Sequence, residues 1–318
     1  MNISPRWAYW AVLLAVFGHA SSEFFAVLTA LPGAVVSVWR FILGGIGLII
    51  LALLFSESRN LLEPFKRSAF QLLRLSLIGV TGAYLAFHMA LDYASVIQVA
   101  TLVTTIPIFV GIANLVINKQ PFTKVKRLTG VCAVTAIALL ITEGALGSLL
   151  KGDRSILGIL LALCCAALIG YYAIAIKPLI AEYGGLRITA LSTMIGGIGL
   201  YLCVTVLLGI PLDTGAVFYD DTIVWVALLI LAFWNTTVTQ YLWIGGLAAA
   251  PDITKASYLF FLKPVIAALL AVIFLGEHLT PARSLRAPSG SGTRFWMRWM
   301  GLQNLLEWPG TGFCPSTV

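Results

Sequence analysis

The chain has 318 residues, of which 60% are hydrophobic and only 10% are charged, and its mean hydropathy is +0.97. A soluble domain of this length could not bury so much apolar surface, so the composition excludes a soluble protein and indicates a membrane protein. The formal net charge of +7 does not indicate nucleic-acid binding, because the basic residues lie in short connections and form no stripe interleaved with aromatic residues.

Nine apolar stretches are long enough for a transmembrane helix, which needs about 20 residues. In chain order we expect these spans at 7–28, 33–55, 70–91, 96–117, 127–144, 156–177, 188–209, 222–244 and 253–275. The connections between them are short, so no soluble domain is inserted. The ninth span contains Lys263 followed by Pro264. We expect a local kink there, because neighbouring helices can satisfy the backbone groups that a proline frees.

The basic residues are divided unequally between the two ends of these spans. If the N-terminus is cytoplasmic, the outer connections before the end of the ninth span contain only Lys151 and Arg154 as bases. The outer connection 210–221 contains three acids and no base. Basic residues favour the cytoplasmic side of a membrane. We therefore predict a cytoplasmic N-terminus.

The chain repeats itself between the fourth and the ninth span. The segment 98–123 aligns without gaps with 255–280. The matched positions include a proline, a terminal threonine and, at the same offset, a tyrosine of an earlier span: Pro107 and Pro264, Thr123 and Thr280, and Tyr84 and Tyr241. Because five spans per repeat is an odd number, the second repeat enters the membrane from the opposite side. The fold class that we predict is an all-α polytopic membrane protein of two inverted five-helix repeats, with the substrate site between them.

A tenth span should follow Thr280, but the sequence does not supply an apolar run there. The longest helix expected in the tail, 295–308, is too short to span and carries Arg298 and Glu307. We therefore expect nine evident spans, with the tenth missing or replaced. The expected division is a first repeat at 1–150, a second repeat at 151–282, and a tail at 283–318 that is disordered or read in a non-native frame; a genuine periplasmic tail is the alternative.

Each half ends with an apolar run, a proline, a second apolar run and a short polar exit. The second copy reads Pro264-VIAALLAVIFLGEHLT, the first runs from Pro107 to Thr123, and the second span contains Val38-Trp-Arg40-Phe-Ile-Leu-Gly-Gly. Over about residues 7–282 these motifs resemble the EamA type of the drug/metabolite transporter superfamily. The resemblance implies ten helices around a central cavity, and export or exchange of small metabolites, often amino acids, across the bacterial inner membrane. That family usually has a glutamate where this chain has Lys263, which leaves the preferred substrate charge open.

Ionisable groups at membrane depth are candidate functional residues, because each costs about 2.5–3.5 kcal/mol to insert. Lys263 lies near the middle of its span. We expect it to face the cavity, where it could bind a substrate carboxylate or neutralise an acidic partner; snorkelling to an interface is the alternative. We expect Arg40 to be a structural or snorkelling arginine near the outer interface rather than a substrate contact.

His19 and Glu23 are four residues apart and therefore share one face of the first span. A titrating group there could accept a coupling proton. The alternative is a polar notch that, with Ser21 and Ser22, bonds a neighbouring helix. The segment HASSE lacks the HExxH spacing, so we expect no metal.

Polar side chains of the third, fourth and eighth spans are the remaining candidates for the cavity wall. Tyr84 and Tyr241 could gate the cavity or stack on a substrate, and His88, one turn after Tyr84, is either a packing residue or a cavity residue. The candidates in the most polar span, the eighth, are Asn235, Thr236, Gln240 and Trp243, and those in the fourth are Gln98 and Thr101. For the eighth span, hydrogen bonds between helices, worth about 0.6 kcal/mol each, are the alternative.

These observations favour a secondary transporter, an exporter of small organic metabolites such as amino acids across the inner membrane. Its expected partners are a small-molecule substrate, the lipid bilayer and a proton for coupling, with no nucleic acid. The alternative is a polytopic membrane enzyme acting on lipid-like substrates. We do not expect this chain to be an enzyme. The acids Asp213, Asp220 and Asp221 have no histidine beside them, and the sequence shows no nucleophile paired with a base. We expect no cofactor. The sequence contains no phosphate-binding glycine loop, so we do not expect this chain to drive transport with ATP.

Overall fold

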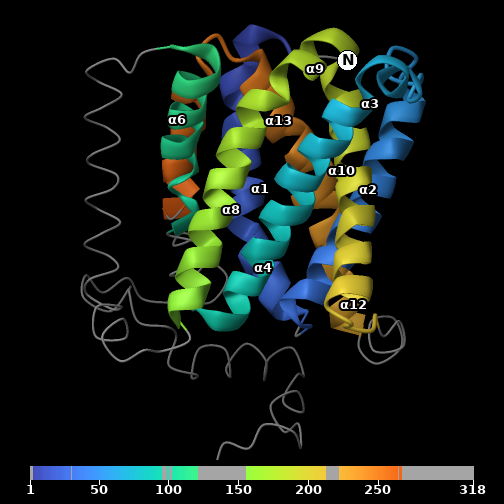
Figure 1. The fold of residues 1–318 in the computed structure, drawn as a ribbon, viewed down its shortest axis with the longest axis vertical. Coiled ribbons are helices and arrows are strands. Elements are labelled where there is room, and N and C mark those ends of the chain that lie inside the picture. Colours follow the sequence, from blue (N-terminus) through green and yellow to red (C-terminus); the bar gives the residue numbers. More distant parts are fainter. Residues whose placement is uncertain are drawn as a thin grey trace, which may run out of the picture. The chain divides into compact units, whose positions relative to one another are not determined.

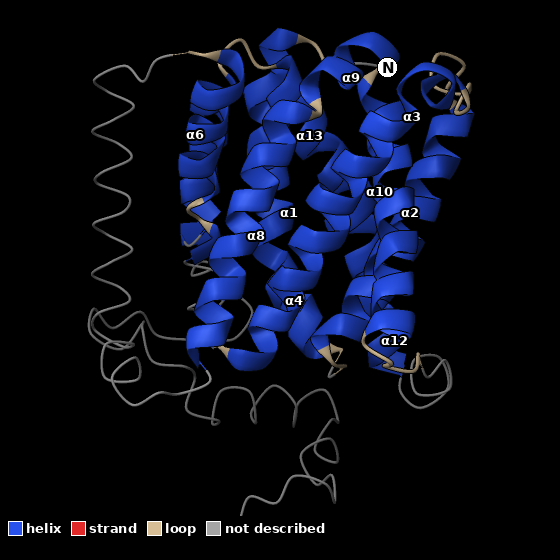
Figure 2. Ribbon diagram, viewed as in Figure 1, coloured by secondary structure: helices blue, strands red, loops and turns tan. Residues whose placement is uncertain are grey.

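The computed structural model describes residues 3–29, 31–94, 99, 102–120, 155–212, 222–263 and 265–266. All regular structure in these residues is helical (Figures 1 and 2). Several predictions concern residues outside this part of the chain: the positions Gln98, Thr101 and Pro264, the span 127–144, and everything after residue 266. The side chain of Glu23 is also outside it.

The described residues of the first half, which end at residue 120, form four helical segments. They are preceded by η1 (Pro5–Trp7) and consist of α1 (Ala8–Leu28), α2 (Gly33–Leu54), the continuous run of α3 (Glu63–Ser76), η2 (Leu77–Gly82) and α4 (Ala83–Tyr93), and α6 (Ile106–Asn118). Pro64 and Pro107 lie in the first turns of α3 and α6, where a helix has no partner for the missing N–H. Lys119 ends α6 with a left-handed backbone, φ 53°.

The second half repeats this order. It consists of α8 (Ser155–Ala175) with α9 (Lys177–Tyr183), α10 (Gly185–Leu202) with η3 (Cys203–Leu207), the continuous run of α12 (Thr222–Ala232), η4 (Phe233–Val238) and α13 (Thr239–Ala249), and α14 (Ile253–Ser257) with η5 (Tyr258–Leu262). Asp252 caps α14, since its carboxylate accepts hydrogen bonds from the amides of Thr254 and Lys255, both at 3.1 Å.

Five helices in the described residues are long and apolar enough to cross a membrane. They are Gly33–Leu54, Glu63–Tyr93, Ile156–Tyr183, Gly185–Leu207 and Thr222–Ala249, and Ile106–Asn118 and Ile253–Leu262 are shorter apolar helices. Large apolar side chains such as Leu54 and Leu207 are exposed on the outside of the bundle, where only lipid could cover them. The protein is therefore an all-α, multi-pass membrane protein, as predicted.

Matching contacts relate the two halves. Thr81 in η2 donates a hydrogen bond to the carbonyl oxygen of Gly196 in α10, at 2.8 Å. Thr237 in η4 donates the equivalent bond to the carbonyl oxygen of Gly44 in α2, at 2.9 Å. Each π-turn therefore packs on the second helix of the other half, through the same residue types. Such reciprocity is the property of a two-fold relation between the repeats.

The two halves run in opposite directions. Gly246, near the end of α13, packs on Ala8 at the start of α1, and Gly158, near the start of α8, packs on Ala94 just after α4. In Figure 1, α1 starts at the end of the bundle marked N and α8 starts at the opposite end. The repeats are thus inverted, as the odd number of predicted spans requires.

The π-turns correct one part of the sequence alignment. Both η2 and η4 are π-helical, and they occupy equivalent places in the third and eighth spans. Because Leu77 corresponds to Phe233, Tyr84 corresponds to Gln240 and not to Tyr241. Tyr241 is half-buried against an apolar cluster around Leu48, whereas Tyr84 is buried inside the bundle. The predicted pairing of the two tyrosines across the axis is therefore wrong.

Most described basic residues gather in one half of the bundle, at the end where α1 starts. They are Arg6, Arg59, Lys66, Arg67, Arg74, Lys119, Lys177, Arg187 and Lys255. In this group Arg187 joins the two repeats, since its Nη1 lies 2.5 Å from Oε2 of Glu63. The two other described bases, Arg40 and Lys263, are buried in the interior.

Candidate functional site

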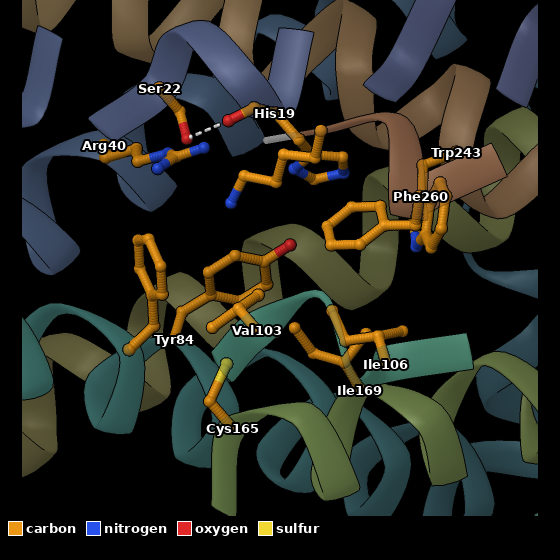
Figure 3. A pocket seen from close by; sticks show the side chains of 12 residues that line it. His19, Ser22, Arg40, Tyr84, Val103, Ile106, Cys165, Ile169, Trp243 and Phe260 are labelled. Atoms are coloured by element: carbon orange, nitrogen blue, oxygen red, sulfur yellow. Dashed lines mark hydrogen bonds between the residues drawn. The ribbon is translucent and has the colours of Figure 1, made fainter. Parts of the chain in front are cut away.

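A cavity lies between the two halves of the bundle. Its walls come from α1, α2, α4, α6, α8, α13 and η5 and from the residues next to them. The lining residues are His19, Ser22, Arg40, Tyr84, Phe87, Val103, Ile106, Cys165, Ile169, Trp243, Phe260 and Lys263 (Figure 3). Helices of both repeats therefore enclose one common space.

Equivalent positions of the two repeats occur together in this lining. The fourth and ninth spans follow the register of the sequence alignment, and the third and eighth follow the register of the π-turns. The equivalent pairs in the lining are Val103 and Phe260, Ile106 and Lys263, and Phe87 and Trp243. The cavity thus lies on the pseudo-two-fold axis, which is where inverted-repeat transporters place their substrate sites.

The two sides of the cavity differ in polarity. In the view of Figure 3, the upper side carries His19, Ser22 and Arg40 from α1 and α2. The lower side carries Val103, Ile106, Cys165 and Ile169, from α6, the turn before it and α8. A symmetric scaffold therefore encloses an asymmetric space, with charge on one side and apolar surface on the other.

Lys263 lines the cavity and is 2% exposed. Its ammonium nitrogen lies 5.7 Å from the ring centroid of Phe87 and 5.4 Å from that of Phe260. These distances are in the range of cation–π attraction, which strengthens when water is excluded. Lys263 therefore faces the cavity and does not reach an interface by snorkelling, while its role in substrate binding stays a prediction.

Arg40 also lines the cavity and is 0% exposed. Its Nε donates to Oγ1 of Thr236 at 2.9 Å, and its Nη2 donates to the carbonyl oxygen of Asn235 at 3.0 Å. These hydrogen bonds are those of a structural arginine, as expected, but Arg40 does not snorkel to an interface and it also lines the cavity. The sequence spacing gave no sign of these partners, because both belong to η4, far along the chain.

The polar residues of the eighth span mostly hold the helices together. Asn235 donates through Nδ2 to the carbonyl oxygen of Gly18 and to Oγ of Ser21, the latter at 2.9 Å. Gln240 donates to the hydroxyl of Tyr84, its equivalent across the axis. Asn235, Thr236 and Gln240 thus stand behind the cavity wall, and Trp243 is the candidate of this span that lines the cavity.

His88 is buried behind Tyr84 and is not part of the lining. Its Nδ1 lies 2.6 Å from Oγ of Ser37 and 2.9 Å from the carbonyl oxygen of Tyr84. Its Nε2 lies 3.5 Å from Nη1 of Arg40. The ring therefore meets the cavity lining through Arg40 and through Phe87, whose ring centroid lies 5.0 Å from that of His88.

His19 lines the cavity from α1 and is 8% exposed. Its ring meets the rings of Trp243 and Phe260 edge to face, at centroid distances of 5.4 and 5.6 Å. Its Nε2 is buried and has no hydrogen-bond partner in the described part of the chain. A buried imidazole nitrogen without a partner carries a desolvation cost, which a ligand in the cavity could relieve.

Comparison with known proteins agrees with a chain of two related halves. The sequence model of the EamA-like transporter family matches residues 6–142 and 156–285, one segment for each half. The chain belongs to the EamA-like transporter family. It is therefore a membrane transporter, and the resemblance seen in its motifs is confirmed.

Two named relatives are similar to this EamA-like transporter over most of their length. An uncharacterized transporter of Clostridium kluyveri is 24% identical over 278 residues, covering 85% of this chain and 86% of the relative. The uncharacterized transporter YyaM of Bacillus subtilis is 25% identical over 237 residues, covering 74% of each. A solved crystal structure has a TM-score of 0.67 and 18% identity over 96% of this chain and 97% of its own, a likeness that shows the fold alone.

In this EamA-like transporter the predicted site residues separate into groups. Those that line the cavity are Lys263, Tyr84, Trp243 and His19, and those that stand behind its wall are His88, Asn235, Thr236 and Gln240. The lining residues that the sequence did not predict are Ser22, Arg40, Phe87, Val103, Ile106, Cys165, Ile169 and Phe260. The repeat alignment could have found Ile106, because it matches Lys263.

Proposed function

We propose that this transporter is a secondary exporter of small organic metabolites that carry a carboxylate, such as amino acids. The supporting observation is the pair of buried cations, Arg40 and Lys263, that line one cavity between the repeats. Guanidinium and ammonium groups bind carboxylates through charge-assisted hydrogen bonds, which gain strength where water is excluded.

The apolar side of the cavity suits the remainder of such a substrate. Val103, Ile106 and Ile169 offer aliphatic surface opposite the charged side. The faces of Tyr84 and Trp243 could contact an apolar side chain or attract a substrate ammonium group. A small amphipathic anion or zwitterion therefore matches both sides of the cavity.

We propose that His19, together with Glu23, accepts the coupling proton. His19 faces the same cavity as the two cations, so its protonation would change the charge that a substrate meets. The unpartnered Nε2 gives a proton or a substrate atom a place to bind. Transport should then respond to a pH gradient.

We also propose that the chain lies in the inner membrane with its N-terminus in the cytoplasm. The clustering of described basic residues at the end where α1 starts supports this orientation. At that end Arg59 lies in the connection between α2 and α3, Lys177 begins α9, and Lys255 lies in the short helix α14.

The test is substrate counterflow in proteoliposomes with a panel of radiolabelled amino acids. We expect uptake of at least one of them, a large loss of uptake for Lys263→Met, and normal uptake for the control Lys255→Met, because Lys255 is exposed at the end of the bundle. Wild-type uptake by Lys263→Met would refute the substrate site. Chemical conversion of a lipid-like substrate, with no amino acid transported, would favour the enzyme alternative.

A further inference from the structure

The guanidinium of Arg40 donates hydrogen bonds to Thr236 and Asn235 of the π-turn η4, and we call this arrangement the clamp. We propose that the clamp orients Arg40 to bind the anionic group of the substrate. In this proposal Arg40 is the substrate-binding residue and Thr236 is its positioning residue. The inference rests on the proposed function, because it assigns the group that recognises the substrate carboxylate.

The π-turn gives Thr236 a defined role as a hydrogen-bond acceptor. Its hydroxyl donates to the carbonyl oxygen of Leu231 at 2.8 Å, five residues earlier, which matches the wider hydrogen-bond step of a π-helix. An arginine can only donate. The Thr236 oxygen therefore accepts from Nε of Arg40 at 2.9 Å while its proton is held by Leu231. Its hydroxyl is thus locked in the orientation that the guanidinium requires.

The neighbouring contacts fix the plane of the guanidinium. Nη2 donates to the backbone oxygen of Asn235 at 3.0 Å, in the same turn. Nη1 lies 3.5 Å from Nε2 of His88, which must accept because the guanidinium only donates. The His88 proton is then on Nδ1, which donates to the carbonyl oxygen of Tyr84 at 2.9 Å. Helix α4 and the π-turn thus hold Arg40 from two sides.

Comparison with the opposite repeat distinguishes the features that belong to the fold from those that belong to the substrate site. It has an equivalent π-turn, η2, and an equivalent threonine contact to a glycine. The position that matches Arg40 is Ser192, whose hydroxyl lies 2.7 Å from that of Tyr172, and the position that matches Thr236 is Val80. The π-turn therefore recurs in both halves as part of the fold, whereas the arginine and its threonine occur only on the charged side of the cavity.

The fixed plane matters because a carboxylate binds a guanidinium best when both groups are coplanar. An arginine whose plane is set in advance loses less conformational entropy on binding. A lysine at this position would keep the positive charge but lose the planar fork of paired N–H donors that a guanidinium presents to a carboxylate. The clamp therefore predicts selectivity for a planar carboxylate over its uncharged carboxamide.

The experiment uses variants of the purified full-length protein. Thr236→Val keeps the shape but removes the hydroxyl, and Thr236→Ser keeps the hydroxyl. Thr239→Val is the matched control, since the Thr239 hydroxyl makes the same five-residue bond to Trp234, at 2.8 Å, in the same span. Arg40→Lys tests the fork itself. Binding is measured as the rise in melting temperature with sodium butyrate, and with butyramide as the uncharged probe. Transport is measured as KM and maximal rate for the panel amino acid taken up fastest.

We expect butyrate, and not butyramide, to stabilise the wild type, Thr236→Ser and Thr239→Val. Thr236→Val and Arg40→Lys should bind butyrate about tenfold more weakly or worse, the effect of losing a hydrogen bond to a charged group. Their KM should rise by a similar factor while the maximal rate changes less. Butyrate binding by Thr236→Val equal to that of the wild type would overturn the proposal, as would equal weakening in Thr239→Val or no butyrate binding by the wild type. Butyrate binding without uptake of any amino acid would refute the proposed function, but it would leave standing the proposal that η4 orients Arg40 to bind a carboxylate.

Discussion

Substitution of Gly197 by alanine should destabilise the protein where α2 and α10 cross. A Cβ added at Gly197 would lie 2.9 Å from the carbonyl oxygen and 3.0 Å from the carbonyl carbon of Phe41, and 3.1 Å from the amide nitrogen of Ile42. All three are backbone atoms of α2, so no side chain can rotate away. The two helices would have to separate instead.

The size of the effect follows from these distances. Carbon atoms pack best at about 3.5–4.0 Å, so the helices must separate by roughly 0.5 Å or more. Overpacking of this kind costs about 1–3 kcal/mol, and the better helix propensity of alanine returns up to ~1 kcal/mol. The expected net destabilisation is therefore about 0–3 kcal/mol relative to the wild type, and about 1–3 kcal/mol relative to a glycine-to-alanine change that gains the same helix propensity without overpacking. Gly82→Ala is the control, because its nearest neighbours, a methyl group of Leu168 and the carbonyl oxygen of Leu77, are both 3.5 Å away.

The assay is thermal unfolding of the two variants in detergent, followed by tryptophan fluorescence. Gly197→Ala should melt below Gly82→Ala, which should itself melt at or above the wild type. If Gly197→Ala were as stable as Gly82→Ala, the close backbone crossing of α2 and α10 would be refuted.

Three further predictions concern the hydrogen bond between the two repeats, the topology of the chain in the membrane and the coupling of transport to protons. Tyr84→Phe removes the group that accepts the Gln240 hydrogen bond and leaves a buried amide unpaired. It should therefore lower the free energy of unfolding by about 1–3 kcal/mol, and an unchanged value would contradict the bond. In a background without native cysteines, an impermeant thiol reagent should label Pro211→Cys but not Asn60→Cys in intact cells, since both positions are exposed at opposite ends of the bundle; the reverse pattern would invert the topology. His19→Asn should abolish the response of transport to a pH gradient in proteoliposomes, and a retained response would exclude His19 as the proton acceptor.

The membrane spans were predictable because hydropathy is a strong signal over 20 residues. The predicted span 33–55 corresponds to α2, Gly33–Leu54, and 222–244 lies within the continuous helix Thr222–Ala249. The inverted arrangement was also predictable, since it needs only a repeat and an odd number of spans. Both inferences use one-dimensional patterns that the bilayer imposes on any chain.

The depth of Arg40 could not be predicted in this way. Its position seven residues into a span is compatible with an arginine that reaches the interface and with one that points inward. The difference depends on which helix faces it, and the groups that stabilise it, Thr236 and the backbone of Asn235, lie in the other repeat. Hydropathy carries no information on such a pairing.

The register error at Tyr84 has a definite physical origin. The fourth and ninth spans keep the alignment in which Ile106 matches Lys263, and both line the cavity. The third and eighth spans, matched by their π-turns, are offset by one residue from it, so the sequence from Gln240 to Lys263 is one residue longer than the sequence from Tyr84 to Ile106. A loop tolerates such an insertion at little cost, so an offset found in one pair of helices need not hold across a loop. The shift places Gln240 opposite Tyr84. A side-chain hydrogen bond therefore joins the two repeats on the axis, where any rocking of one repeat against the other must either carry both residues along or break it.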